Sequence, residues 1–375
     1  MRPPQINAHH DRNRLPLAER IAQLTRTGLA GKYAHRVATP PSVPGTVLEF
    51  ARVKPSVGGQ VDIIIAAWTA EDTVARAVSS ALAQEAVARV IVVDDASADG
   101  TMAAARACGT DDDRLLVLRQ TTNAGPSAAR NRAIAAGNAP WIAILDADDL
   151  LQPGRIARLL AQAEGCDIIG DDLLVVDEGA EADTPRLMLG SQVHDAWLDL
   201  PAFVMGNVAD GSGDRAELGY IKPLMRRSFL DAHRLRYDES IRLGEDYDLY
   251  LRALVCGARF RVVSAQGYIY VQRADSISGN HGEEDLRRLR EVDRRVLGMP
   301  GLDRGARAAL SNHYRSVDCR FQWRRVIRAF KERKPGEIAG AFTRSPQVSL
   351  YLLGKLGEQV VVRLGRQLRI GAAPR

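Results

Sequence analysis

Carboxylates cluster directly after two apolar segments of this sequence. The run PWIAIL (140–145) is followed by Asp146, Asp148 and Asp149, and the run VIVV (90–93) is followed by Asp94 and Asp95. An unpaired buried charge is expensive, so these acids need water, a cation or a protein partner. Gathered carboxylates repel one another unless a cation lies among them. If the five side chains share one rim, the pattern predicts a cation-binding site there.

The segments around these acids indicate how they are positioned. Apolar runs predict strands over 61–68, 89–97, 114–120 and 140–146, and helical spacing predicts helices over 73–84, 99–109 and 125–137. Such alternation indicates an α/β fold with a mixed, mostly parallel sheet and helices on both faces. In these sheets ligands bind beyond the carboxyl ends of the strands, so both acidic groups should open onto one crevice. The alternative is that Asp99 or Asp149 merely caps the next helix.

Length and composition exclude several classes of protein. The chain has 375 residues, 46% hydrophobic and 26% charged, which suits one large globular domain or two. Its four cysteines lie far apart, which favours reduced thiols in a cytosolic protein over a zinc or redox motif. No apolar run is long enough to span a bilayer, and the start lacks an apolar signal-peptide core. We therefore expect a cytoplasmic protein.

The net charge of +5 is unevenly distributed. Residues 1–60 carry +6 and residues 320–375 carry +10, which leaves −11 for residues 61–319. Basic arms favour an anionic surface, and the helix expected over 348–370 has the apolar and basic composition of one that lies in a membrane interface. Its alternative is packing on the rest of the protein. The basic segments carry no nucleic-acid-binding signature, so we expect no nucleic acid partner and possible attachment to the inner face of the membrane.

Five stretches in order resemble glycosyltransferase family 2, the inverting group with the GT-A, Rossmann-like fold. They are VDIIIAAW, VIVVDDASADGT, TNAGPSAARNRAI, WIAILDADDLLQPGRI and LGEDYDLYLRAL, within residues 61 to about 275. The resemblance implies a catalytic domain over 61–280, with a nucleotide-binding half (61–150) and an acceptor-binding half (151–280). A basic, partly irregular arm (1–60) and a helical basic extension (281–375) flank it.

By this resemblance, Asp146-Ala147-Asp148 is the DXD motif that holds Mn²⁺ or Mg²⁺ against the diphosphate of a nucleotide sugar. Asp148 is the expected metal ligand, and Asp146 is expected to contact the ribose or sugar, or the metal through water. Asp95 matches the acid that contacts the nucleobase. Hard oxygen ligands and a divalent cation suit a leaving group that gains charge as its bond breaks.

Four more residues complete the donor side expected from the resemblance. Arg130 matches an arginine near the phosphate or base, although it has the alternative of being an ordinary surface residue. Ala66 and Trp68 end the first strand, and Trp68 either covers the base or belongs to the core. Arg273 lies in YIYVQRADSIS (268–278), where with Ser276 it either meets the diphosphate or belongs to an edge strand with an exposed loop.

Glu245 and Asp246 begin a helix expected over 244–257. Acids at a helix start commonly complement the helix dipole, which is the alternative to a catalytic role. The resemblance identifies them as the ED motif, with Asp246 as the catalytic base.

The expected function is metal-dependent, inverting hexosyl transfer from a nucleoside-diphosphate sugar, with UDP as the favoured nucleotide. The acceptor would be a glycan or lipid-linked saccharide in bacterial exopolysaccharide or lipopolysaccharide assembly. A sugar-nucleotide nucleotidyltransferase is disfavoured because its Gly-rich loop is absent. An oxidoreductase is disfavoured because AAWTAED stands where GxGxxG is required. An inactive GT-A scaffold is disfavoured because the DXD and ED acids are both present.

Overall fold

The computed structural model describes six segments of the chain: 61–109, 112–178, 185–190, 195–208, 218–273 and 282–370. Side chains on the last helix are described as far as Val361. The arm predicted over 1–60 and Ser276 lie outside the described residues.

The first half of the sheet is parallel, as predicted. Its strands run in the order β3-β2-β1-β4. Their bounds are Val61–Ala67 (β1), Val87–Asp94 (β2), Leu115–Arg119 (β3) and Trp141–Ile144 (β4). Ile64 on β1 lies beside Ile91 on β2 and Ile144 on β4, and all three are buried. Apolar side chains fill both faces of these strands, which requires a helical layer on each side.

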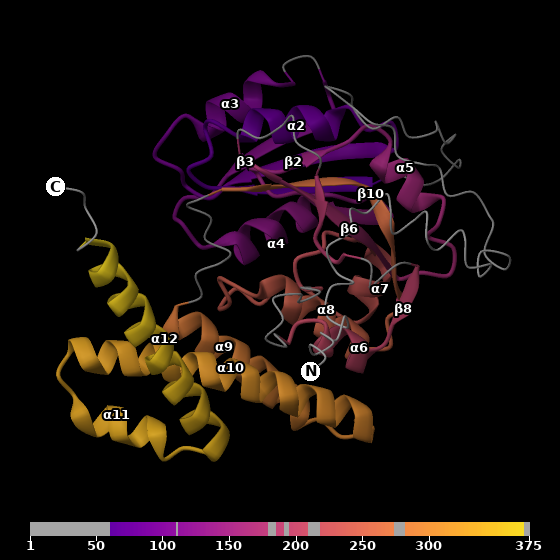
Figure 1. Cartoon of the computed structure of the whole chain (residues 1–375). Coiled ribbons are helices and arrows are strands. Elements are labelled where there is room, and N and C mark those ends of the chain that lie inside the picture. The colour runs from indigo at the N-terminus through magenta and orange to yellow at the C-terminus, as the bar shows by residue number, and fades with distance from the viewer. Residues whose placement is uncertain are drawn as a thin grey trace, which may run out of the picture. The chain divides into compact units, whose positions relative to one another are not determined.

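Helices cover both faces of this half-sheet (Figure 1). They are α2 (Val74–Leu82), α3 (Thr101–Ala107) and α4 (Pro126–Ala136). Val74, Ala77 and Val78 of α2 share a core with Ile63 and Ile65. Ala129, Ala133 and Ile134 of α4 share the opposite core with Ile64 and Ile91. Alternate residues of β1 therefore pack into the two cores, because successive side chains of a strand point to opposite faces of the sheet.

The second half of the sheet is mixed. Its strands are β5 (Leu150–Leu151), β6 (Ile168–Asp177), β7 (Arg186–Leu187), β8 (Ala196–Leu198), β9 (Leu224–Arg226) and β10 (Phe260–Gln272). The order continues β4-β9-β6-β10-β5, with β9 antiparallel to both its neighbours and β6 parallel to β10. Tyr268 and Ile269 of β10 pair with both β5 and β6, so the alternative of an edge strand is wrong for them. Among the described strands, Tyr270 to Gln272 pair with β6 alone, so an edge position remains possible for this end of β10.

Eight further helices, among them the α8 predicted over 244–257, complete the described fold. They are α5 (Arg155–Leu160), α6 (Leu200–Met205), α7 (Arg227–Ala232), α8 (Glu245–Val255), α9 (Glu283–Leu297), α10 (Arg304–Lys331), α11 (Pro335–Phe342) and α12 (Pro346–Ile370). The helical C-terminal region is confirmed, whereas α11 was not predicted. None of the helices in the described part of the chain has the length and apolar character needed to cross a bilayer.

The C-terminal helices contribute side chains to two separate hydrophobic cores. Side chains of α9 and α10, including Leu286, Val292 and Leu310, join the core that contains Tyr250 of α8. Beyond them, α12 packs through Val348 and Leu352 onto a separate small core with α10 and α11. As far as its side chains are described, to Val361, the helix predicted over 348–370 therefore packs on its helical neighbours through one face.

Candidate active site

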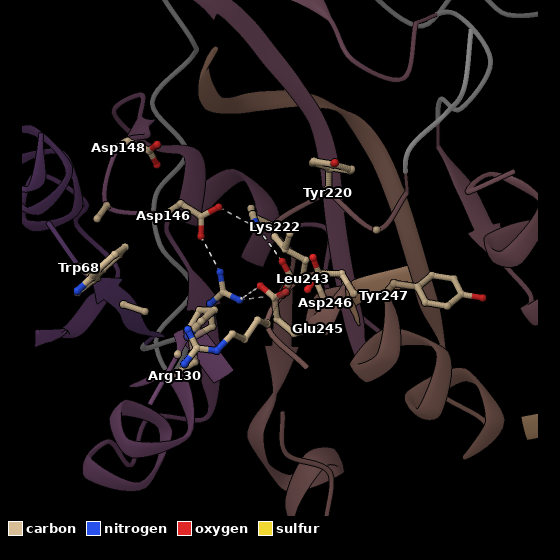
Figure 2. A pocket seen from close by; sticks show the side chains of 18 of the residues that line it. Trp68, Arg130, Asp146, Asp148, Tyr220, Lys222, Leu243, Glu245, Asp246 and Tyr247 are labelled. Carbon is tan, nitrogen blue, oxygen red and sulfur yellow. Dashed lines mark hydrogen bonds and ion pairs between the residues drawn. The ribbon is translucent and has the colours of Figure 1, made fainter. Parts of the chain in front are cut away.

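All nine predicted site residues line one hollow of about 720 Å³. They are Ala66, Trp68, Asp95, Arg130, Asp146, Asp148, Glu245, Asp246 and Arg273. Most donor-side residues lie at or just after the carboxyl ends of β1, β2 and β4, whereas Arg130 comes from α4 and Arg273 follows β10. The two acids of α8 reach the same space from another part of the chain (Figure 2). The expected crevice is therefore present, while the role of each residue remains a prediction.

Asp146 is held between two cations. Its carboxylate accepts hydrogen bonds from Arg130 at 2.8 Å and lies 3.0 Å from Lys222 Nζ. Burial alone would raise the pKa of Asp146, but the charges of Lys222 and Arg130 outweigh it and lower the pKa to about 2. Asp146 is therefore ionised at neutral pH and already paired with protein cations.

Asp148 has the opposite electrostatic environment. Burial and the neighbouring charge of Asp146 raise its pKa above the ordinary value. No cluster of three or more His, Cys, Asp or Glu side chains suited to a metal occurs in the described segments. One under-compensated carboxylate nevertheless fits Mg²⁺ or Mn²⁺, because such ions often bind through one or two carboxylates and the phosphates of the substrate.

Two of the five clustered acids do not line the hollow. Asp149 is buried and accepts hydrogen bonds from Tyr268 Oη at 2.8 Å and Val271 N at 2.9 Å, which ties the DXD segment to β10. Asp94 is buried and accepts from Ser97 N at 3.0 Å. The expectation that all five carboxylates share one rim is therefore wrong, because two of them satisfy backbone and side-chain donors within the fold. Capping by Asp149 is also wrong, since its partners lie on β10.

The ED acids are fixed at the start of α8. Glu245 accepts from Arg130 at 2.5 Å, and burial raises the pKa of Glu245 despite this pair. Asp246 accepts from Lys222 Nζ at 2.7 Å and from Tyr237 Oη at 3.0 Å. Both acids are therefore engaged by side chains across the hollow, beyond what complementing a helix dipole requires (Figure 2).

Lys222 and Tyr237 were missed by sequence analysis. Lys222 is buried and bridges Asp146 and Asp246, which are distant in sequence. Burial would lower the pKa of Lys222, but the carboxylates of Asp146 and Asp246 raise it, so the amine stays charged. The available signal was a single lysine in the apolar stretch YIKPLM (220–225), within a region whose fold the sequence did not reveal.

Trp68 and Asp95, both predicted to contact the base, line the hollow. Trp68 is 54% exposed, so its alternative of a core residue is wrong. Asp95 accepts from Gln120 Nε2 at 2.7 Å, Ala124 N at 2.9 Å and Gly125 N at 2.7 Å. These bonds order the loop before α4. A carboxylate accepts about four hydrogen bonds, so Asp95 retains room for about one further donor.

Arg130, Arg273 and Asn131, the neighbour of Arg130, also have clear positions. Arg130 is buried, so the surface alternative is wrong. Arg273 follows β10 and lies 3.6 Å from Glu178. Asn131 donates to Tyr237 O at 2.9 Å and accepts from Tyr237 N at 2.9 Å, which makes it a support for the loop carrying Tyr237.

Comparison with known proteins identifies relatives of this chain. The model of "Glycosyl transferase family 2" matches residues 62–229. The succinoglycan biosynthesis protein ExoU of Rhizobium meliloti (strain 1021) is 42% identical over 304 residues, which cover 78% of this chain and 86% of ExoU. ExoO of the same strain is 43% identical over 224 residues, covering 58% of this chain and 62% of ExoO.

Solved structures bear on the fold. The crystal structure of S. aureus TarS 1-349 in complex with UDP-GlcNAc superposes with a TM-score of 0.53 at 17% identity, over 80% of each chain. The predicted GT-A fold is thereby confirmed. The protein is a glycosyltransferase, and the chain belongs to family 2 of these enzymes. It is related to proteins of the biosynthesis of succinoglycan, an exopolysaccharide.

Proposed function

We propose that this enzyme transfers one sugar from a UDP-sugar to a hydroxyl of a growing exopolysaccharide unit, with inversion at the anomeric carbon. The observation that carries this proposal is the position of Asp246, which lines the same hollow as Asp146 and Asp148 but comes from α8. A base on a separate element can stand on the side of the sugar opposite its leaving group.

The donor would lie along the carboxyl ends of β1, β2 and β4. Trp68 offers an exposed aromatic face to the base, and Asp95 has acceptor capacity for one N–H of a uracil ring. UDP is our proposal on these two residues; the TarS complex, at 17% identity, supports the fold.

A divalent cation would be held by Asp148 together with the donor phosphates. When bound, Mn²⁺ or Mg²⁺ supplies charge stabilisation to the departing diphosphate. The protein's own cations, Arg130 and Lys222, offset part of the negative charge of Asp146 and the ED acids, so they limit the repulsion that the diphosphate meets on entering. We also propose that Arg273 approaches the diphosphate, since it lines the hollow.

In the transfer step Asp246 accepts the proton of the acceptor hydroxyl. The acceptor oxygen forms its bond to the anomeric carbon as the bond from that carbon to the diphosphate oxygen breaks, and the bonding electron pair leaves with UDP. Lys222 and Tyr237 hold the two carboxylate oxygens of Asp246. This fixes the base in one orientation before the acceptor arrives, which is how positioned bases gain efficiency.

The acceptor is proposed to be a glycan or lipid-linked saccharide at the cytoplasmic membrane surface. This rests on relatives named for succinoglycan biosynthesis and on α12, where Leu350, Leu353, Val360 and Val361 are exposed. Residues 320–375 also carry +10. An exposed apolar stripe in a basic segment suits an anionic interface.

A donor panel tests the function. Purified protein is incubated with UDP-, GDP-, ADP- and dTDP-sugars and Mn²⁺, and nucleoside diphosphate release is measured with and without saccharide acceptors. We expect slow release from one UDP-sugar and faster release with an acceptor. A sugar-1-phosphate product would indicate a nucleotidyltransferase, and no turnover of any donor would indicate an inactive scaffold.

A further inference from the structure

The start of α8 is clamped from the C-terminal helices on both sides of the ED acids. On one side, Gly244 has φ of +86° and lies so close to Leu289 of α9 that an added Cβ would be 2.5 Å from it. On the other side, Tyr247 Oη donates to Asp293 of α9 at 2.9 Å. Glu245 and Asp246 lie between these two contacts.

The contact at Tyr247 is a buried polar network. His313 of α10 lies 2.7 Å from the second carboxylate oxygen of Asp293 and 3.1 Å from Tyr247 Oη. With a proton on Nδ1, His313 donates to Asp293, so this carboxylate accepts from both partners. Asp293 is fully buried and His313 is 3% exposed. The Tyr247 ring also stacks on His313 and on Phe203.

Stability alone explains this network poorly. Apolar groups of similar shape are often as stable as a buried charged cluster, whereas a satisfied polar network fixes one arrangement. Tyr247 donates to Asp293, and His313 holds this acceptor from its other oxygen. Tyr247 in turn directly follows Asp246 in the chain. The hollow reaches the same helices, since Leu289 and His313 line it together with Asp246.

We propose that α9 and α10 complete the catalytic centre, with Asp293 and His313 as positioning residues that hold Tyr247 and thereby the base Asp246. This deepens the proposed function and rests on Asp246 being the base. The pair acts on the geometry of α8, without touching donor or metal. Loss of the network should therefore lower kcat for transfer while donor affinity stays the same.

The test compares Tyr247→Phe with a matched control in the same helices. Tyr247→Phe keeps the stacked ring and removes the hydroxyl. In the control, Asp318→Asn weakens the Arg290–Asp318 pair of 3.0 Å, which joins α9 to α10. His313→Gln is a second test variant, in which the substitution lies outside the sequence of α8. Measurements are acceptor-dependent kcat and KM, donor affinity by calorimetry, and hydrogen exchange of the amides of 244–248.

We expect Tyr247→Phe and His313→Gln to lower kcat about 10- to 100-fold, because small misplacements of a reacting group have effects of that size. Donor affinity should be unchanged, exchange at 244–248 should accelerate, and Asp318→Asn should retain kcat. Equal losses in all three variants, or wild-type kcat and exchange in the test variants, would overturn the proposal.

Failure of the proposed function gives a different pattern. In that case the wild type transfers no sugar, or Asp246→Asn transfers normally, whereas hydrogen exchange still reports whether the network holds the start of α8. Unchanged exchange in Tyr247→Phe and His313→Gln would then overturn the positioning role independently.

Discussion

Lys222 Nζ donates to Asp246 at 2.7 Å, so the proposed base is paired with a buried lysine. The same amine lies 3.0 Å from Asp146. One cation therefore links the end of β4 to the start of α8, and it compensates charge on both carboxylates.

Replacing Lys222 by Met should impair both folding stability and transfer. Removing one partner of a buried pair leaves uncompensated charge, which costs about 3–5 kcal/mol of unfolding free energy. We expect turnover to fall at least tenfold. Lys222→Arg, which keeps the charge, is the control and should lose less stability. Denaturant unfolding measures the loss of stability, and transfer assays measure the loss of turnover. A Lys222→Met variant as stable as wild type would contradict the pairing.

Asp246→Asn should reduce transfer by about 10²-fold or more, which is the usual size of a general-base effect. The amide keeps the shape and removes the proton acceptor, so donor affinity should barely change. Glu245→Gln is the matched control, because it alters the neighbour that pairs with Arg130. A severe loss in Glu245→Gln with normal turnover in Asp246→Asn would transfer the role to Glu245.

Asp148→Ala should weaken UDP binding only when Mn²⁺ is present. The carboxylate is expected to contribute through the cation, so binding in excess chelator should match wild type. Calorimetry of UDP with Mn²⁺ and with chelator makes the comparison, and Asp113→Ala, an exposed acid before β3, is the control. Identical binding by mutant and wild type in Mn²⁺ would refute metal ligation by Asp148.

The depressed pKa of Asp146 predicts a pH dependence of stability. Its pKa falls from 3.8 to about 2 on folding. The stabilisation is therefore present above about pH 4 and is lost as the pH falls towards 2. Asp146→Asn should be less stable than wild type at pH 6, and this difference should shrink between pH 4 and pH 2. Urea unfolding across this pH range measures the difference in unfolding free energy between variant and wild type. A difference that grows on acidification would contradict the lowered pKa of Asp146.

The exposed stripe of α12 should contribute to binding anionic vesicles. Truncation at Val348 would also remove Val348 and Leu352 from a core, so surface substitutions are the sharper experiment. The triple variant Leu350→Ser, Leu353→Ser, Val361→Ser should cofloat less with phosphatidylglycerol vesicles at low salt, with donor hydrolysis intact. Trp197→Ser removes an equally exposed apolar group elsewhere and is the control. Unchanged flotation of the triple variant would assign α12 another role.

Local sequence determined the first, parallel half of the sheet and the helices that cover it. Strands β1 to β4 and helices α2 to α4 appear near the predicted positions, because each carries its own periodicity and its own termini. The acids of the DXD and ED motifs were recognisable for the same reason, since each motif is contiguous in the chain.

Only the tertiary structure decided which charges compensate one another. Asp149 faces β10 although it directly follows Asp148, whose carboxylate lines the hollow, and no local pattern separates the two. Lys222, Tyr237, Asp293 and His313 have no motif, and they acquire their places only when distant segments pack. A buried charge takes its partner from whichever element the fold brings within hydrogen-bonding distance, and sequence spacing does not encode that distance.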